Sequence, residues 1–150
     1  MSAPVLTFPV GSDEAVDYVD RVRKLGPDIE ASANEIEQSR RVPESLLDKL
    51  LAAGLFKLLV PECYGGGEVH PVTFFKTISA LAEYDGTVAW CVGQANGCAV
   101  SAASVPAEIA EQIWGNPRGI VAWGPGRGKA MPDGDGYLIS GSWMFASGGH

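Results

Sequence analysis

Aromatic side chains near the end of the sequence have the types and spacing to contact a flat ligand. Residues 119–150 contain Trp123, Trp143 and Phe145 among small residues, and Ser147 follows Phe145 by two positions. Aromatic rings supply contact area for a planar heterocycle, and a hydroxyl can hydrogen bond to its nitrogen or carbonyl oxygen. Trp143 and Phe145 would share one side of a strand. Burial of Phe145 in a barrel core is the simpler interpretation of this alternation.

The glycine-rich stretch before these aromatics fails the spacing test for a phosphate-binding loop. In GPGRGK, Gly124 and Gly128 enclose three residues, and Ala130 follows Lys129. A phosphate loop has four residues between its glycines, Ser or Thr after the lysine, and a helix behind it. We interpret the stretch as a surface turn, with a modest anion contact by Arg127 or Lys129 as the alternative.

The remaining reactive side chains are not arranged for hydrolysis or metal binding. His70 is expected in a loop, and no acidic residue stands near Ser147 and His150 to orient an imidazole. Asp133 and Asp135 lie in a glycine-rich turn, which they are expected to shape. The sequence contains no Cys-x-x-Cys or His-x-x-x-His pattern, so no metal site is predicted.

Composition and charge restrict the class of protein. The chain has 150 residues, of which 46% are hydrophobic, and a net charge of −7. A packed core is therefore expected, and the lack of a basic face argues against nucleic-acid binding. Cys63, Cys91 and Cys98 without a secretory signal predict free thiols in the cytoplasm. The uncharged stretch 86–107 is rich in small and polar residues, so it predicts a buried bundle helix and not a membrane span.

Helical periodicity covers most of the chain before residue 118. Helices are expected to begin at or near Ser12, Pro43, Pro71, Thr87 and Pro106. Gly26 and Pro27 should interrupt the first helix, because proline lacks a backbone N–H and clashes with the preceding turn. Gly54 is predicted to end the second helix in a left-handed conformation. The triple glycine 65–67 predicts unusual backbone angles or a close approach of another segment.

The pattern then changes to short strands. We expect strands over 119–124, 137–140 and 143–147, a turn at 133–136 and a hairpin around Gly141. Three strands cannot close a barrel. The sequence therefore predicts a mainly α chain, with a helical domain over 1–117 and the start of a β-domain over 118–150.

Three segments carry a family pattern: RRVPESLLDKLLAAGLFKLLVPECYGGGE, LAEYDGTVAW and DGDGYLISGSWMFASG. They resemble the N-terminal part of the acyl-CoA dehydrogenase superfamily, and more narrowly the oxygenase components of two-component flavin-dependent monooxygenases. The resemblance implies an N-terminal helical domain of the acyl-CoA dehydrogenase type, followed by the first strands of an incomplete β-barrel domain. In that superfamily the flavin ring lies between the barrel and a C-terminal helical domain.

The resemblance also implies which residues face the flavin, which is FAD or FMN. The family places an aromatic and a hydroxyl residue against the ring, and these match Phe145 and Ser147. An earlier family strand matches Val121 and Trp123, which are therefore expected there too. The catalytic glutamate or histidine of the family belongs to its C-terminal domain. The catalytic residues are thus expected in a C-terminal part that these 150 residues lack.

Departures from the family pattern favour the monooxygenase branch. The dehydrogenases have Thr-Glu-Pro and Gly-Ser-Asp where this sequence has WGP at 123–125 and GKA at 128–130. The resemblance then implies oxygenation of an aromatic or heteroaromatic small molecule, with reduced flavin as co-substrate from a flavin reductase. FAD-dependent dehydrogenation of a CH–CH bond in an acyl-CoA is the alternative. The family commonly forms tetramers, so a homo-oligomer is expected, and neither nucleic acid nor a membrane is an expected partner.

A third alternative is a truncated, non-catalytic interaction module. Its exposed apolar strands would favour association with another surface. A flavin dissociation constant below about 1 μM, which corresponds to a binding free energy of about 8 kcal/mol, would exclude this alternative.

Overall fold

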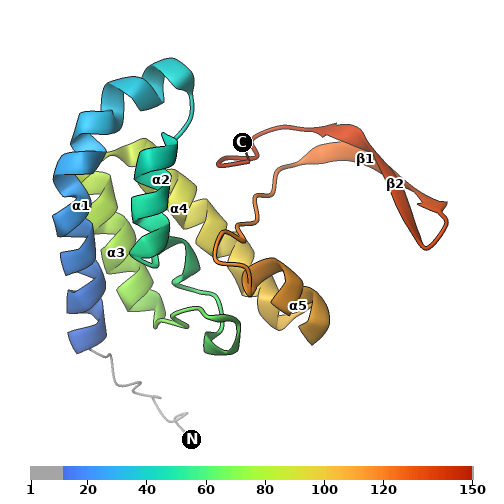
Figure 1. The fold of residues 1–150 in the computed structure, drawn as a ribbon, viewed down its shortest axis with the longest axis horizontal. Coiled ribbons are helices and arrows are strands. Elements are labelled where there is room, and N and C mark those ends of the chain that lie inside the picture. The colour runs from blue at the N-terminus through green and yellow to red at the C-terminus, as the bar shows by residue number, and fades with distance from the viewer. Residues whose placement is uncertain (1–11, 150) are drawn as a thin grey trace, which may run out of the picture.

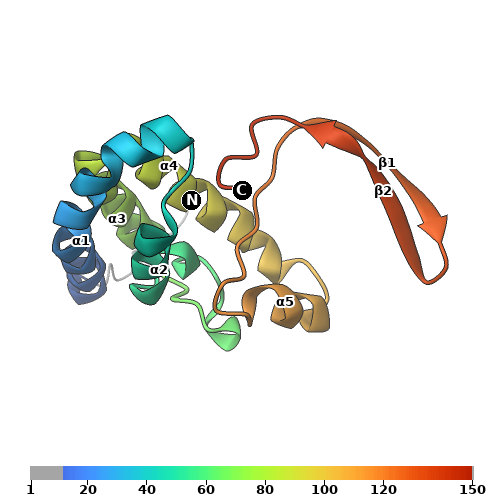
Figure 2. The same cartoon turned by 45° about the horizontal axis from the view of Figure 1, so that its top comes forward.

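The computed structural model describes residues 12–149, which form a helical body and a β-hairpin that extends away from it (Figure 1 and Figure 2). The helices are α1 (Ser12–Ser39), α2 (Glu44–Ala52), α3 (Pro71–Tyr84), α4 (Gly86–Ala99) and α5 (Ala107–Trp114), and the strands are β1 (Gly126–Asp133) and β2 (Gly136–Trp143). Short 3-10 helices cover Leu55–Lys57, Glu62–Tyr64 and Val100–Ala103. The described chain is mainly α, as the sequence predicts.

α1 is one continuous helix, so the interruption predicted at Gly26 and Pro27 is wrong. Pro27 lies inside α1, which curves instead of breaking (Figure 1). One buried face continues across the proline at seven-residue spacing through Val22, Ile29 and Ile36. Packing of this face outweighs the lost backbone hydrogen bond. Gly26 permits a close contact, because a Cβ there would lie 2.4 Å from the Tyr84 ring of α3.

Two apolar clusters stabilise the helical body. The larger cluster joins α1, α2, α3 and α4, and its fully buried members include Leu50, Leu81 and Val92. The smaller cluster lies against α5 and consists of Val60, Ala99, Ala102, Ala110 and Trp114. α4 contributes to both clusters, which confirms that the uncharged stretch forms a buried bundle helix. Within residues 12–149, no helix combines the length and hydropathy needed to cross a bilayer.

α4 begins next to Thr87, as the sequence predicts, but Thr87 does not cap it. Asp85 is the N-cap, and its Oδ1 accepts the Val88 backbone N–H at 2.8 Å. Thr87 is exposed in the first turn. Aspartate is the better placed residue because it lies three positions before the free donor, which is the usual spacing of an N-cap bond.

Asp85→Ala should therefore lower the free energy of unfolding by about 1 kcal/mol, because the Val88 N–H loses its acceptor. Thr87→Ala, in the same turn, should change it by less than about 0.5 kcal/mol. Urea unfolding followed by far-UV circular dichroism measures both variants. Equal losses would show that Asp85 does not cap α4.

Glycines shape the loop between α2 and α3 in two ways. Gly54 and Gly65 have φ values of 75° and 76°, so the left-handed conformation predicted for Gly54 is confirmed. Gly66 lies against Val60, because a Cβ on Gly66 would be 1.9 Å from the Val60 carbonyl oxygen. The triple glycine thus provides both features that its sequence predicts, an unusual backbone angle and a close approach.

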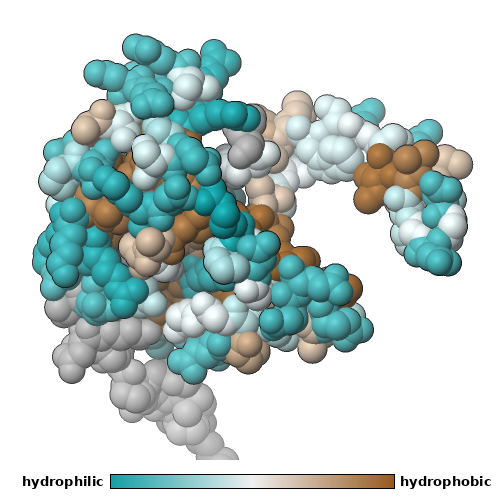
Figure 3. All heavy atoms as spheres, in the orientation of Figure 1, coloured by the Kyte–Doolittle hydropathy of each residue, from teal (hydrophilic) through white to brown (hydrophobic). Residues whose placement is uncertain are grey.

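The hairpin is antiparallel, and its register pairs Gly126 with Trp143 and Asp133 with Gly136. The turn predicted at 133–136 is confirmed, with Gly134 at a φ of 58°. Both strands are exposed along their whole length. Figure 3 shows apolar side chains on the hairpin, away from the helical body. Its exposed large apolar residues include Met131, Leu138 and Ile139.

Three predictions about the strands are wrong, and one of them is the strand over 143–147, since only Trp143 of that range lies in β2. Residues 119–124 form no strand, because the segment packs against the helical body through Ile120 and Val121 and has no strand partner there. Gly141 is not at a hairpin turn but lies inside β2, opposite Gly128 of β1. The sequence pattern identified the turn at 133–136 correctly but not the strand that pairs across it.

The glycine-rich stretch GPGRGK lies partly in β1, so its interpretation as a surface turn is wrong. The indole of Trp143 crosses the glycines of the hairpin. A Cβ would lie 2.5 Å from the indole at Gly126 and 2.8 Å from it at Gly128 and Gly141. Glycine at these positions leaves room for the ring on the sheet surface. Trp143 therefore has a structural role in the hairpin.

Candidate functional site

A cleft of about 620 Å³ lies where the helical body meets the two segments that flank the hairpin. α4 contributes Thr87, Cys91 and Ala95 to its lining, and the segment after β2 contributes Ala146–Gly149. Leu47 and Phe56 add apolar surface. A cleft of this size with mixed polar and apolar walls suits a small organic ligand.

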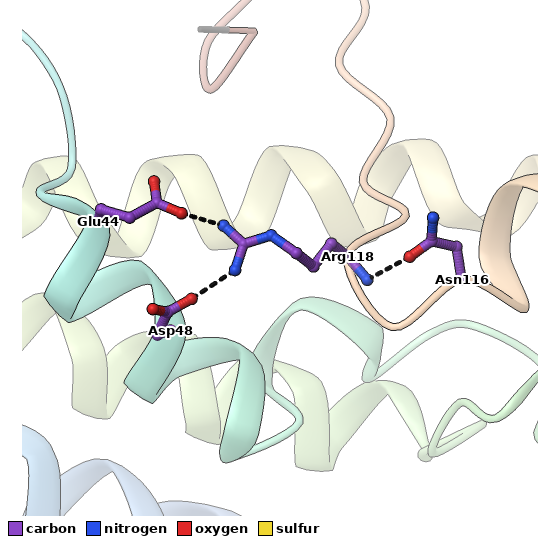
Figure 4. Close-up of polar contacts among 4 residues, drawn as sticks. All are labelled: Glu44, Asp48, Asn116 and Arg118. Carbon is purple, nitrogen blue, oxygen red and sulfur yellow. Dashed lines mark hydrogen bonds and ion pairs between the residues drawn. The ribbon is translucent and has the colours of Figure 1, made fainter.

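Part of the cleft lining is charged. Arg118 lies there and makes ion pairs with Glu44 and Asp48 of α2, while its backbone N–H donates to Asn116 Oδ1 at 2.9 Å (Figure 4). The hydrogen bond to Asp48 and the charge of Glu44 raise the pKa of Arg118. These contacts hold the segment before the hairpin against α2, so that Ile120 lines the cleft.

α4 holds both segments that flank the hairpin. Trp90 Nε1 donates to Ser147 Oγ at 3.0 Å. Burial raises the pKa of the Cys98 thiol, and a hydrogen bond with the Trp123 backbone partly opposes this rise. Burial and the charge of Asp85 raise the pKa of Cys91, so this thiol at the cleft stays protonated at neutral pH. α4 thus positions the segments that line the cleft and contributes one unreactive thiol, that of Cys91, to its lining.

The four residues predicted to face a flat ligand are not all in one place. Ser147 lines the cleft. Val121 packs against the smaller apolar cluster. The side chains of Trp123 and Phe145 are 63% and 83% exposed, and neither lines the cleft. The two exposed rings lie on the segments just before and just after the hairpin, on either side of its base.

The prediction that Trp143 and Phe145 share one side of a strand is wrong. β2 ends at Trp143, and Phe145 has a φ of 57°. The Ser147 backbone N–H donates to the Phe145 carbonyl oxygen at 2.9 Å. The chain therefore turns at Phe145, and the two-residue alternation of a strand does not extend to it.

The sequence did not single out Trp90 as a site residue. It is the one large aromatic residue of α4, whose other residues are mostly small, and it could have been noticed for that reason. Within the described residues, no group of His, Cys, Asp and Glu side chains could hold a metal ion. Arg127 and Lys129 lie on exposed β1, apart from the cleft lining, and His150 lies outside the described residues.

This helical body is an N-terminal domain of the acyl-CoA dehydrogenase type. Residues 12–106 match the family model "Acyl-CoA dehydrogenase, N-terminal domain". The chain belongs to this family.

Similar proteins with known activities are flavin-dependent oxygenases. The chain is 29% identical over 133 residues to the oxygenase subunit HsaA of a flavin-dependent monooxygenase from Rhodococcus jostii, covering 87% of this chain and 35% of that protein. It is 31% identical over 121 residues to indole-3-acetate monooxygenase from Pseudomonas putida, covering 79% and 31% of the two chains. The chain thus spans about a third of the length of these relatives.

A solved structure extends the similarity to the fold. XiaF from Streptomyces sp., in complex with FADH2 and glycerol, superposes with a TM-score of 0.81 at 27% sequence identity. The match covers 88% of this chain and 34% of that chain. The sequence similarity to HsaA also extends beyond the family model. It spans 133 residues, whereas the family model matches only residues 12–106.

Proposed function

We propose that the protein acts as the oxygenase component of a two-component flavin-dependent monooxygenase with an aromatic or heteroaromatic substrate. The similarity to such oxygenases over 87% of the chain is the observation that carries this proposal. The relatives include an indole-3-acetate monooxygenase and an FADH2-dependent resorcinol hydroxylase component, which both act on aromatic compounds.

The residues present fit a flavin at the base of the hairpin. Trp123 and Phe145 expose most of their rings, so they can cover a planar heterocycle. Ser147 accepts a hydrogen bond from Trp90 and keeps its own hydroxyl proton for a flavin heteroatom. Val121 would anchor the segment that carries Trp123, because its side chain packs against the smaller apolar cluster of the helical body.

The chain's own residues would bind and orient the flavin and the substrate, and would shield the reacting groups from water. Reduced flavin, when bound, supplies the electrons that activate dioxygen. The adjoining cleft of about 620 Å³ would take the aromatic substrate. Its apolar residues, Leu47, Phe56 and Ala95 among them, would limit the access of water to the reacting groups.

Further features belong to the same proposal. Residues 1–117 would form the helical domain and residues 118–150 the opening of the β-domain. A flavin reductase would supply reduced FAD or FMN, and the protein would form a homo-oligomer. The free state of Cys63, Cys91 and Cys98 supports a reducing compartment such as the cytoplasm.

Flavin binding tests this function directly, since the chain spans only about a third of its relatives and binding precedes turnover. Anaerobic titration with reduced FMN and reduced FAD should give an affinity of about micromolar or tighter for one of them. Ser147→Ala should weaken that affinity about fivefold, the value of one hydrogen bond. Ser140→Ala, an exposed serine of β2, is the matched control and should bind as the parent does.

Two outcomes would argue against the proposal, and a third would revise the residues of the flavin site. Binding weaker than millimolar would favour a non-catalytic interaction module. Reduction of bound FAD by an acyl-CoA, without hydroxylated product from reduced flavin and oxygen, would favour the dehydrogenase. Unchanged flavin affinity in Ser147→Ala would remove Ser147 from the flavin site while leaving the rest of the proposal intact.

A further inference from the structure

We propose that Trp90 is a positioning residue for the Ser147 hydroxyl. The indole Nε1 of Trp90 donates to Ser147 Oγ at 3.0 Å, and the two residues are 57 positions apart in the sequence. The bond joins α4 to the segment after β2. This inference rests on the proposed function, in which Ser147 faces the flavin.

The chemistry of the two groups gives the bond a direction. An indole N–H can only donate, whereas a serine hydroxyl has one proton and two lone pairs. Trp90 therefore occupies a lone pair of Ser147, and the hydroxyl proton remains free to donate. A hydroxyl that already accepts a hydrogen bond is a better donor and rotates less. Trp90 would thus prepare Ser147 to donate to an acceptor atom of the flavin.

The surroundings of Trp90 do not explain the residue by packing. Its side chain is 60% exposed, so it adds little to the core. The cleft lining includes Ser147 but not Trp90, so Trp90 has no place at the substrate. Its contact with Ser147 is the feature that connects it to the site.

Trp90→Phe removes the N–H and keeps a flat, smaller aromatic ring. We expect reduced flavin to bind about threefold more weakly to this variant. The double variant Trp90→Phe/Ser147→Ala should bind no more weakly than Ser147→Ala alone, because Trp90 acts through Ser147. If the double variant lost affinity by the product of the two single-variant factors, Trp90 would act independently of Ser147 and the proposal would be overturned. Tyr137→Phe, which also removes one hydrogen-bond donor from an exposed aromatic residue of β2, is the control and should leave the affinity unchanged.

A measurement without flavin tests the hydrogen bond itself. In ¹⁵N-labelled protein, the indole N–H resonance of Trp90 is identified by its loss in Trp90→Phe. This resonance should shift in Ser147→Ala and stay in place in Ser140→Ala. An unshifted resonance in Ser147→Ala would overturn the proposal whatever the flavin does. A shifted resonance in a protein that binds no flavin would reject the proposed function, and with it the positioning role, but not the contact between α4 and Ser147.

Discussion

Asn96→Ala should lower the free energy of unfolding by about 3 kcal/mol, one of the two largest effects that we expect from a single substitution. Asn96 is fully buried in α4. Its Oδ1 accepts the Leu59 N–H at 3.0 Å, and its Nδ2 donates to the carbonyl oxygens of Leu55 and Val92 at 2.8 and 2.9 Å. Alanine would leave the part-buried Leu59 N–H and the buried Leu55 carbonyl without these partners. Each orphaned group costs about 1–3 kcal/mol.

Asn96 matters because of where these bonds lie. They fasten the loop after α2 to α4, between the cluster that contains Leu55 and the cluster that contains Val60. Urea unfolding monitored by far-UV circular dichroism gives the loss. Gln94→Ala, at a partly exposed position of the same helix, should cost less than about 0.5 kcal/mol. A loss below about 1 kcal/mol for Asn96→Ala would mean that water or a shifted loop satisfies both backbone groups.

Gly66→Ala should also destabilise the protein by about 3 kcal/mol. A Cβ at this position would lie 1.9 Å from the Val60 carbonyl oxygen and 2.5 Å from the Val60 Cβ. The Val60 side chain is fully buried, and its carbonyl oxygen accepts the Glu68 N–H at 3.0 Å. The clash is with backbone, so a change of rotamer cannot relieve it. The loop must move, and the hydrogen bond from Glu68 would be lost.

Neighbouring glycines separate this steric effect from backbone strain. Gly65 has a φ of 76° but open space around its Cβ position, so Gly65→Ala should cost about 1 kcal/mol through its conformation alone. Gly86 has open space and no positive φ, so an alanine there should be neutral or slightly stabilising. Thermal and urea unfolding of the three variants gives the ranking. Equal losses for Gly65→Ala and Gly66→Ala would contradict the steric explanation.

Local signals in the sequence were reliable where chemistry within a few residues decides the structure. Pro71 begins α3, Gly54 adopts the left-handed conformation, and the turn at 133–136 forms. Each of these depends on a missing N–H, a missing Cβ or a short run of turn residues. The uncharged stretch likewise forms a buried helix because its small apolar residues suit close packing.

Local signals failed where distant partners decide. Pro27 does not break α1, because a buried face continues on both sides of it. Residues 119–124 have the composition of a strand but lie on the helical body, where no strand can pair with them. The same holds for the site. The spacing of Phe145 and Ser147 suggested a strand, but the chain turns between them.

By itself, the sequence determined the mainly helical fold, the β-turn at 133–136 and the family to which the chain belongs, since these depend on local composition and motifs. Only the tertiary structure decided how the residues around the hairpin are used. It placed Trp143 over the glycines of β1, Arg118 between Glu44 and Asp48, and Trp90 on the hydroxyl of Ser147. These partners lie far apart in the chain, and a contact of this kind leaves no spacing that a single sequence can reveal.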